Sequence, residues 1–219
     1  MTPEKPEPAR IVVLISGSGS NMATIAAACA RDEIDAEIVG VISNRPGVLG
    51  LDRAQEMGIP TQVVDHTEYN SREEFDAHLI REIDNFTPDL VVLAGFMRIL
   101  TSDFVRRYKG RMLNIHPSLL PKYKGLNTHK RALEAGDKEH GVTVHFVSED
   151  LDGGPNVIQA VIPVLDDDTE GSLRTRVQEQ EHIIYPIAVK WFVEGRISML
   201  KGDAYFDDQP IPEKGVVLS

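Results

Sequence analysis

The sequence predicts an α/β fold built on an open, twisted, mostly parallel sheet with helices on both faces and antiparallel additions in the C-terminal half. Two observations lead to this prediction. Short apolar runs of strand length, such as residues 89–94, alternate with amphipathic stretches of helical length, the pattern of parallel strands joined by helices. After residue 140, two strand patterns follow each other with only a loop between them, as in antiparallel pairs. The predicted class is Rossmann-like.

The first half of the chain alternates strand and helix patterns. The expected strands span residues 11–15, 36–42, 61–64 and 89–94, and the expected helices span residues 22–30, 48–57, 71–86 and 101–108. The helix at 71–86 is amphipathic, because Phe75, Leu79 and Ile83 fall on one stripe, and Ser71 opens a capping-box sequence. The run at 89–94 is apolar throughout, which is typical of a strand in the middle of a parallel sheet.

The second half begins with a short strand at 111–115 that stops where Pro117 and Pro121 follow. A helix at 129–135, strands at 141–147 and 156–165, a long helix at 169–195 and a terminal strand pair at 197–206 and 209–217 are then expected. The apolar stripe of the long helix leaves Gln178 and Glu181 on a different side. These two side chains are either ordinary surface residues or ligands for hydroxyl and amine groups.

Composition excludes several classes of function. The 219 residues carry a net charge of -11, so no basic field favours nucleic acid. The apolar runs are far shorter than the ~20 residues that a membrane span needs, and the Pro- and Glu-rich N-terminus is unlike a signal peptide. The single Cys29 fits a helix core and excludes an internal disulfide framework, and no cluster of Cys and His has metal-site spacing. We expect a cytoplasmic protein that contains no metal and binds small molecules. We expect it to be a monomer or a homodimer.

A glycine-rich turn, residues 16–21, joins the first strand to the first helix. Such a turn leaves backbone N–H groups at a helix N-terminus, where an anion is favoured. The dinucleotide fingerprint fails because Met22 occupies the third glycine position, and no P-loop lysine follows. A terminal monophosphate therefore fits better than NAD or ATP, although a plain strand-to-helix turn has the same pattern.

The stretch 114–121 reads NIHPSLLP and places Asn114 and His116 where an apolar strand ends. A carboxamide can donate to a carbonyl oxygen that gains negative charge, and an imidazole can carry a proton at neutral pH. Together these groups suit acyl transfer. The alternative is that Asn114 caps a turn and His116 is an ordinary polar residue.

Other loops are expected to meet this pair. The carboxyl ends of parallel strands lie at one edge of the sheet, so the glycine turn, residues 97–100 and Asn114 should line one crevice. Asp152 belongs to an Asp-Gly-Gly loop. Its role is either to form a hairpin turn or to place a carboxylate beside His116, where it would favour the imidazolium. Arg72, in the first turn of its helix, opposes the helix dipole and hints at an anionic ligand; the alternative is a solvated arginine.

Three motifs in order, the turn at 16–21, NIHPSLLP at 114–121 and Asp-Gly-Gly at 152–154, are similar to those of the folate-dependent formyltransferases. The resemblance covers about residues 10–195. It implies transfer of the formyl group of 10-formyltetrahydrofolate to the amine of glycinamide ribonucleotide, in purine synthesis. By this resemblance Asn114 holds the formyl oxygen, His116 stabilises the tetrahedral adduct or moves its proton, and Asp152 orients and charges His116.

The resemblance also assigns binding residues and domains. It puts the phosphate on Gly19, Ser20 and Asn21, the sugar and amine near Gln178 and Glu181, and the folate, beside Asn114, on Arg72, Met97, Arg98, Ile99 and Leu100. Asn127 stands where histidine is often found, which leaves an auxiliary role for that loop in doubt. We expect residues 1–10 to be a flexible arm and 11–219 to be one domain, with a phosphate-binding mononucleotide half at 11–110 and a catalytic half at 111–219.

Rival functions remain open. A formyltetrahydrofolate hydrolase would use water as acceptor, and a tRNA or sugar-nucleotide formyltransferase would use a larger molecule. Strong acidity and the lack of an added nucleic-acid domain disfavour tRNA, and the phosphate turn disfavours the hydrolase. A non-catalytic nucleotide-binding module and a hydride-transferring Rossmann enzyme come from other classes. The non-catalytic module should fail to bind folates, which the transferase must bind. The hydride-transferring enzyme should bind NAD, and failure to bind NAD would exclude it.

Overall fold

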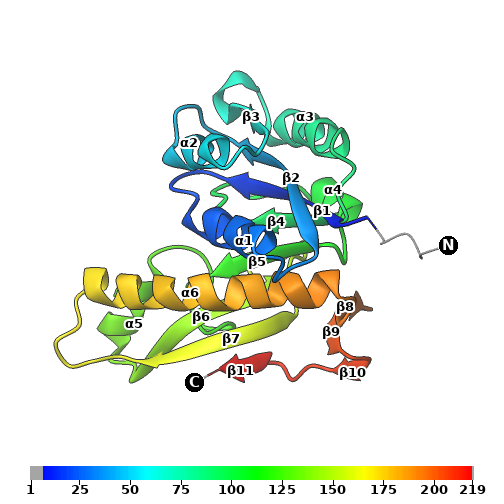
Figure 1. Cartoon of the computed structure of the whole chain (residues 1–219). Helices are drawn as coiled ribbons and strands as arrows, with labels where there is room; N and C mark the ends of the chain where they lie inside the picture. Colours follow the sequence, from blue (N-terminus) through cyan, green and yellow to red (C-terminus); the bar gives the residue numbers. More distant parts are fainter. Residues whose placement is uncertain (1–6, 219) are drawn as a thin grey trace.

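The computed structural model describes residues 7–218 and has one large sheet flanked by helices, with a small second sheet beside it (Figure 1). Within these residues the large sheet has eight strands in the order β11-β7-β6-β5-β4-β1-β2-β3. Their bounds are β1 (Ala9–Ile15), β2 (Ala36–Ser43), β3 (Thr61–Val63), β4 (Leu90–Leu93), β5 (Met112–His116), β6 (Glu139–Phe146), β7 (Asn156–Pro163) and β11 (Val216–Leu218). Of the predicted N-terminal arm, residues 1–6 lie outside the described part, and Ala9 and Arg10 already belong to β1.

The pairing confirms a mostly parallel sheet with antiparallel additions. Strands β1 to β5 pair in parallel, whereas β6 runs antiparallel to both β5 and β7. The helices are α1 (Ser20–Ala30), α2 (Leu49–Glu56), α3 (Arg72–Asp84), α4 (Ser102–Arg107), α5 (Thr128–Ala135) and α6 (Glu170–Val193), with a 3₁₀ turn η1 (His66–Glu68). No helix within residues 7–218 is both long and apolar enough to cross a membrane.

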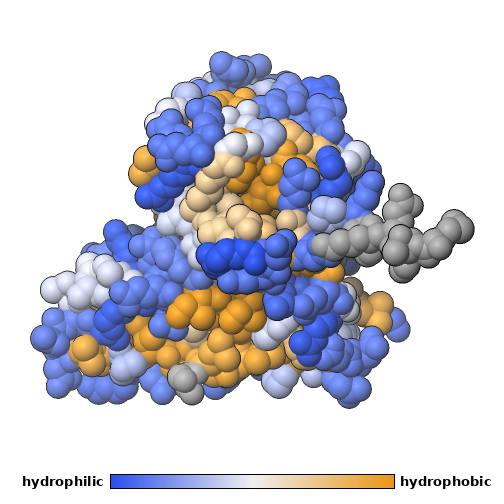
Figure 2. Space-filling model, viewed as in Figure 1, coloured by the Kyte–Doolittle hydropathy of each residue, from blue (hydrophilic) through white to orange (hydrophobic). Residues whose placement is uncertain are grey.

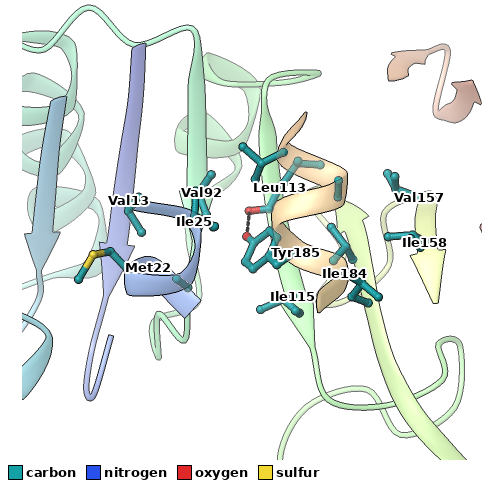
Figure 3. Packing of buried hydrophobic residues seen from close by; sticks show 14 of the residues in the cluster. Val13, Met22, Ile25, Val92, Leu113, Ile115, Val157, Ile158, Ile184 and Tyr185 are labelled. Carbon is teal, nitrogen blue, oxygen red and sulfur yellow. Dashed lines mark hydrogen bonds between the residues drawn. The ribbon is translucent and has the colours of Figure 1, made fainter. Parts of the chain in front are cut away.

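Two hydrophobic clusters cover the two faces of the sheet. Side chains of α1, α2 and α6 form the larger cluster on one face, and side chains of α3 and α4 form the smaller one on the other. Figure 3 shows Met22 and Ile25 of α1 beside Val13 and Val92, and Tyr185 of α6 against Leu113. Both faces of the central strands are therefore buried, which explains why residues 89–94 are apolar without alternation.

Tyr185 fixes α6 to the middle of the sheet. Its hydroxyl lies 2.9 Å from the carbonyl oxygen of Leu93 and 3.1 Å from that of Leu113, on the neighbouring strands β4 and β5. The side chain is fully buried. In the space-filling view, most of this side of the molecule is hydrophilic, with hydrophobic areas next to the long helix (Figure 2).

The predicted strand pair at the C-terminus is wrong in its pairing. Residues 197–206 form an antiparallel hairpin of β8 (Ile197–Leu200) and β9 (Asp203–Phe206), because Lys201 and Gly202 adopt positive φ angles of 55° and 98° and reverse the chain. The short β10 (Gln209–Pro210) adds to β9, whereas β11 joins β7 in the large sheet. The chain therefore returns to the main sheet after leaving it.

The predicted capping box of α3 is only half present. The Ser71 hydroxyl accepts from the Glu74 backbone N–H at 3.1 Å, as expected, but the Glu74 carboxylate accepts from the N–H of Asn70. A complete box caps α6 instead, between Thr169 and Ser172. Both devices satisfy N–H groups at a helix start.

Candidate active site

The glycine loop (residues 16–21) and the segment after β4 meet at the carboxyl edge of the sheet, as predicted. The Met97 backbone N–H donates to the Ser16 hydroxyl at 2.7 Å, and that hydroxyl donates to the Asn44 side-chain oxygen at 2.5 Å. Ser16, Asn44 and Met97 follow β1, β2 and β4, which are neighbours in the sheet. These bonds fix the two loops to each other along the edge next to β5.

Asn114 and His116 lie on one face of β5, because side chains alternate along a strand. The antiparallel register pairs Asn114 with His145 and His116 with Thr143 of β6, so all four side chains share that face. Leu113 and Ile115 point to the opposite face, where they pack into the cluster beneath α6. The strand therefore anchors itself on one side and presents polar groups on the other.

Asp152 reaches His116 from the loop between β6 and β7. One Asp152 carboxylate oxygen lies 3.4 Å from Nδ1 of His116, and both side chains are only 8% exposed. The same oxygen accepts from the Gly125 backbone N–H at 2.9 Å. Asp152 takes a positive φ of 47°, which aspartate tolerates better than most residues. The predicted meeting of Asn114, His116 and Asp152 at one place is therefore present in the geometry.

The Asp-Gly-Gly loop is pressed against β6. A side chain on Gly154 would clash with the carbonyl oxygen of Phe146, and one on Gly153 would come 2.6 Å from the Asp150 Cβ. Only glycine lets the backbone approach so closely. These glycines hold Asp152 over the end of β5.

The other nitrogen of His116 is also occupied. Its Nε2 lies 2.9 Å from the backbone carbonyl oxygen of Tyr123, in a loop where Tyr123, Gly125 and Asn127 all have positive φ angles. The Ser118 carbonyl accepts from the Thr143 hydroxyl at 2.7 Å, which ties the start of this loop to β6. Asn127 serves as the residue before α5 and makes no side-chain capping hydrogen bond.

His145 completes the group, and the sequence analysis missed it. Its Nδ1 lies 2.8 Å from the Phe146 carbonyl oxygen, so Nδ1 carries the proton, and Nε2 accepts from the Asn114 amide nitrogen at 3.2 Å. The same Nε2 is 3.9 Å from an Asp152 oxygen. Burial lowers the pKa of His145 to about 4, so the ring is neutral at pH 7. The alternation of Thr143 and His145 with buried apolar residues was the available signal.

The glycine loop has the geometry of an anion site. Gly19 precedes α1 with a φ of 66°, and neither a side-chain cap nor an acidic residue occupies the first turn of the helix. The N–H groups there lack intrahelical acceptors. A Cβ on Gly19 would come 2.7 Å from the Gly50 Cα of α2, so the loop and α2 are in direct backbone contact.

Gln178 and Glu181 of α6 reach this loop. The Gln178 amide donates to the Ser20 hydroxyl at 3.2 Å, and the Asn21 amide donates to a Glu181 carboxylate oxygen at 2.7 Å. Burial raises the pKa of Glu181. Tyr185, one turn further along α6, bonds to the Leu113 carbonyl, so this part of α6 lies against β5 as well as the glycine loop.

The segment 97–100 forms a partly open apolar edge. Met97 is 62% exposed and Ile99 58% exposed, whereas Leu100 packs against the smaller core cluster. The Arg98 guanidinium lies 5.8 Å from the centre of the Phe75 ring, and its buried Nε has no partner within the described chain. Arg72 is exposed at the start of α3.

The buried Asp76 carboxylate ties this segment to α3, and it is a second residue that the sequence analysis missed. One of its oxygens accepts from the Thr101 backbone N–H at 2.6 Å. Burial raises the pKa of Asp76, and the charges of Arg72 and Arg98 oppose that rise. Arg72, Arg98 and Asp76 therefore lie close enough for their charges to interact, and nothing in the spacing of the sequence marked Asp76.

A family model described as formyl transferase matches residues 9–189 of the chain. This match covers β1 to most of α6, and with them both loops and the Asn114 group.

The chain belongs to the formyl transferase family.

Its relatives within the formyl transferases are similar over nearly the whole chain. The phosphoribosylglycinamide formyltransferase of Escherichia coli (strain K12) is 52% identical over 205 residues, covering 94% of this chain and 97% of that protein. A solved structure of the phosphoribosylglycinamide formyltransferase of Coxiella burnetii has a TM-score of 0.93 and 49% sequence identity, covering 97% of this chain and all of that one. The trifunctional purine biosynthetic protein of Drosophila melanogaster is 52% identical over 189 residues, which is 14% of its length.

These similarities confirm the predicted resemblance and the predicted fold class. The chain is thus a formyl transferase enzyme. One side of its site borders a cavity of about 340 Å³ that Asp152, Gly153, Lys124 and Asn156 line together with residues of the C-terminal strands. Within residues 7–218, no group of three or more His, Cys, Asp or Glu side chains has the arrangement of a metal site.

Proposed function

We propose that this formyl transferase moves the formyl group of 10-formyltetrahydrofolate to the amine of glycinamide ribonucleotide, in de novo purine biosynthesis. The observation that carries the proposal is the distance of 3.4 Å between His116 and Asp152, beside Asn114 and along the same sheet edge as the glycine loop. An acyl-transfer group and an anion site then lie in one crevice. The names of the relatives give the same acceptor.

Asn114 acts on the formyl oxygen. The acceptor amine adds to the formyl carbon, and the carbonyl oxygen gains negative charge in the tetrahedral adduct. The Asn114 amide nitrogen gives one N–H to His145, which fixes the amide plane and leaves its second N–H for that oxygen. A preorganised donor of this kind is worth about 2.7–4 kcal/mol in the transition state.

His116 and Asp152 handle the proton. When the carbon–N10 bond breaks, the folate nitrogen needs a proton and the new formamide must lose one from the former amine. An imidazolium held by Asp152 can donate toward the oxyanion or carry this proton between the two nitrogens. Because Nε2 of His116 faces the Tyr123 carbonyl, that carbonyl must give way when the substrates bind. The step requires no metal, since amine and formamide carbon react directly once held together.

The binding assignments are those that the resemblance implies, and the contacts between these residues support them. The phosphate lies on Gly19, Ser20 and Asn21, and Gln178 and Glu181, which contact this loop, take the sugar and the glycinamide amine. The folate lies along Arg72, Met97, Arg98, Ile99 and Leu100, where the exposed Met97 and Ile99 suit a flat heterocycle and the arginines suit a carboxylate. Residues 11–110 then supply the phosphate-binding half and residues 111–219 the catalytic half of one cytoplasmic enzyme.

The test measures formyl transfer from 10-formyltetrahydrofolate with and without glycinamide ribonucleotide. We expect formylated product only when the ribonucleotide is present. Release of formate without any acceptor would instead assign the chain to the hydrolases, and binding of a nucleotide monophosphate without folate binding would assign it to non-catalytic modules.

The variant that tests the proposed role of Asp152 is Asp152→Ala, which removes the carboxylate beside His116. We expect turnover to fall at least ~100-fold, with circular dichroism and thermal unfolding showing a folded protein. Asp152→Asn is the matched control, because it keeps the side-chain oxygen that accepts from Gly125; it should lose activity as well. Near-normal turnover in both variants would remove Asp152 from the mechanism.

A further inference from the structure

Arg53 lies beside the glycine loop and forms a hydrogen bond with it. It lies on α2, is partly buried, and donates from one terminal nitrogen to the Ser18 carbonyl oxygen at 2.9 Å. In the described part of the chain it forms no ion pair, whereas Arg107, Arg176 and Arg196 each pair with an aspartate. A guanidinium has five N–H donors, so the bond to Ser18 leaves donors unused.

The contact between α2 and the loop holds Arg53 in place. The Gly50 backbone N–H donates to the Gly17 carbonyl at 3.0 Å, and Gly50 and Gly19 touch through their backbones. A Cβ on Gly50 would come 2.5 Å from Ile15 and 2.9 Å from the Gly17 carbonyl oxygen. Arg53 lies one turn of helix after Gly50, so its position relative to Ser18 is set by packed backbone.

The two α6 side chains that bond to the loop are not cations. Gln178, which reaches Ser20, is neutral, and Glu181, which reaches Asn21, is a carboxylate. His182 is next in α6, and burial and the charge of Arg53 both lower its pKa. Asn21 is 8% exposed, and its amide nitrogen is already bonded to Glu181. The loop thus combines helix N–H groups that lack intrahelical acceptors with one arginine.

We propose that Arg53 is a phosphate-binding residue of this enzyme, the charge partner of the phosphate that the acceptor places on residues 19–21. The inference rests on the proposed function, since it takes the acceptor to be a ribonucleotide. A phosphate carries close to two negative charges at neutral pH, and the protein has a net charge of -11. The long-range field is therefore unfavourable to the substrate, and a local guanidinium is needed to offset it.

The experiment compares two acceptors, glycinamide ribonucleotide and the dephosphorylated glycinamide riboside, in wild type and in Arg53→Gln. We expect kcat/KM to fall about 10- to 100-fold for the ribonucleotide, the range of a hydrogen bond to a charged group. For the riboside it should change less than about threefold. Arg53→Lys keeps the charge without the planar fork and should fall between the two.

Arg31→Gln is the matched control, because it removes the same charge from the far end of α1, where Arg31 is exposed and pairs with Glu33. It should change neither acceptor's kcat/KM. A purely structural role for Arg53 predicts a lower melting temperature without ligand and an unchanged salt dependence of KM. Charge pairing predicts a salt dependence that weakens in Arg53→Gln.

Two results would overturn the inference: equal losses for both acceptors, or no loss for the ribonucleotide. Binding of inorganic phosphate, measured by calorimetry, keeps the test independent of the proposed reaction. If the wild type formylates neither acceptor, the proposed function fails, yet phosphate should still bind at least about tenfold more weakly to Arg53→Gln. Equal phosphate affinity in both proteins would refute the role of Arg53 alone.

Discussion

The glycine loop and the Asn114 cluster (Asn114, His116, His145 and Asp152) present different chemical groups, backbone in the loop and side chains in the cluster. The loop is one contiguous stretch that offers backbone N–H groups, and its shape depends on glycines that touch α2. The cluster offers side chains from β5, β6 and the loop before β7, and its shape depends on strand register and on buried hydrogen bonds. A backbone site tolerates changes of side chain that leave the turn intact, whereas a side-chain site depends on every member.

The comparison also separates binding from chemistry. In the proposed mechanism, the backbone groups of the loop bind a charge that does not change during the reaction, so their contribution is the same before and in the transition state. The groups of the cluster would act on charge that develops only in the transition state, and such groups affect turnover most. Substitutions in the two regions should therefore divide between KM and kcat.

The largest expected effect is that of Asn114→Ala. Loss of the formyl-oxygen donor should lower kcat by about 100- to 1000-fold with little change in thermal stability, since the side chain is only partly buried. Steady-state kinetics with both substrates measure it. If KM for the ribonucleotide rises instead while kcat holds, the division between the two regions is wrong.

The second prediction concerns acid stability. Burial lowers the pKa of His140 and of His145 to about 4, below the ordinary value near 6.5, so the unfolded chain binds more protons than the folded one between these values. Stability should therefore fall as pH drops from about 6.5 toward 4, by up to roughly 3 kcal/mol for each imidazole.

Urea unfolding at pH 7 and pH 5 measures this loss. His140→Gln removes one of the two imidazoles and lies outside the Asn114 cluster, so its stability should depend less steeply on pH than that of the wild type. An unchanged slope in this variant would place the acid sensitivity elsewhere in the molecule.

The third prediction compares a glycine from each region. Gly154→Ala should destabilise the protein by roughly 1–3 kcal/mol, because the new methyl group meets the Phe146 carbonyl and Asp152 moves away from His116. Gly17→Ala is the control, since nothing lies within 4 Å of a Cβ there and its φ is not positive. Chemical denaturation and kcat should both single out Gly154. Equal behaviour of the two variants would show that the Asp152 loop can adapt.

The smallest expected effect is that of His145→Gln. The ring keeps the Asn114 amide in plane through one neutral hydrogen bond, and such a bond is worth about 0.5–1.5 kcal/mol. We expect kcat to fall roughly tenfold and KM for both substrates to stay close to wild type. Gln can donate to the Phe146 carbonyl but cannot reproduce the geometry of both ring nitrogens. A larger loss than that of Asn114→Ala would make His145, not Asn114, the central group.

Features of the fold and the site that lie within one continuous stretch of sequence could be predicted, whereas contacts between distant stretches could not. The glycine turn, NIHPSLLP and Asp-Gly-Gly are local patterns, and the alternation of apolar runs predicted the parallel sheet whose edge brings them together. His145 was missed because its partner Asn114 becomes visible only once β6 is paired antiparallel to β5 in the observed register. Arg53 and Asp76 were missed because their contacts cross between helices and loops, where no spacing rule applies.

The C-terminal error has the same origin. A turn at Lys201 and Gly202 split one predicted strand, and only the pairing of β11 with β7 shows that the chain comes back to the large sheet. Lysine at a positive φ is uncommon, but Gly202 was a turn signal that the prediction did not use.

The Tyr123 carbonyl also limits access to His116. With Asp152 at one ring nitrogen and the Tyr123 carbonyl at the other, the His116 side chain is only 8% exposed. Under the proposed mechanism, His116 could not activate water at the formyl group while the Tyr123 carbonyl occupies Nε2. We therefore expect the enzyme to spare its formyl donor from hydrolysis until the acceptor has displaced this carbonyl.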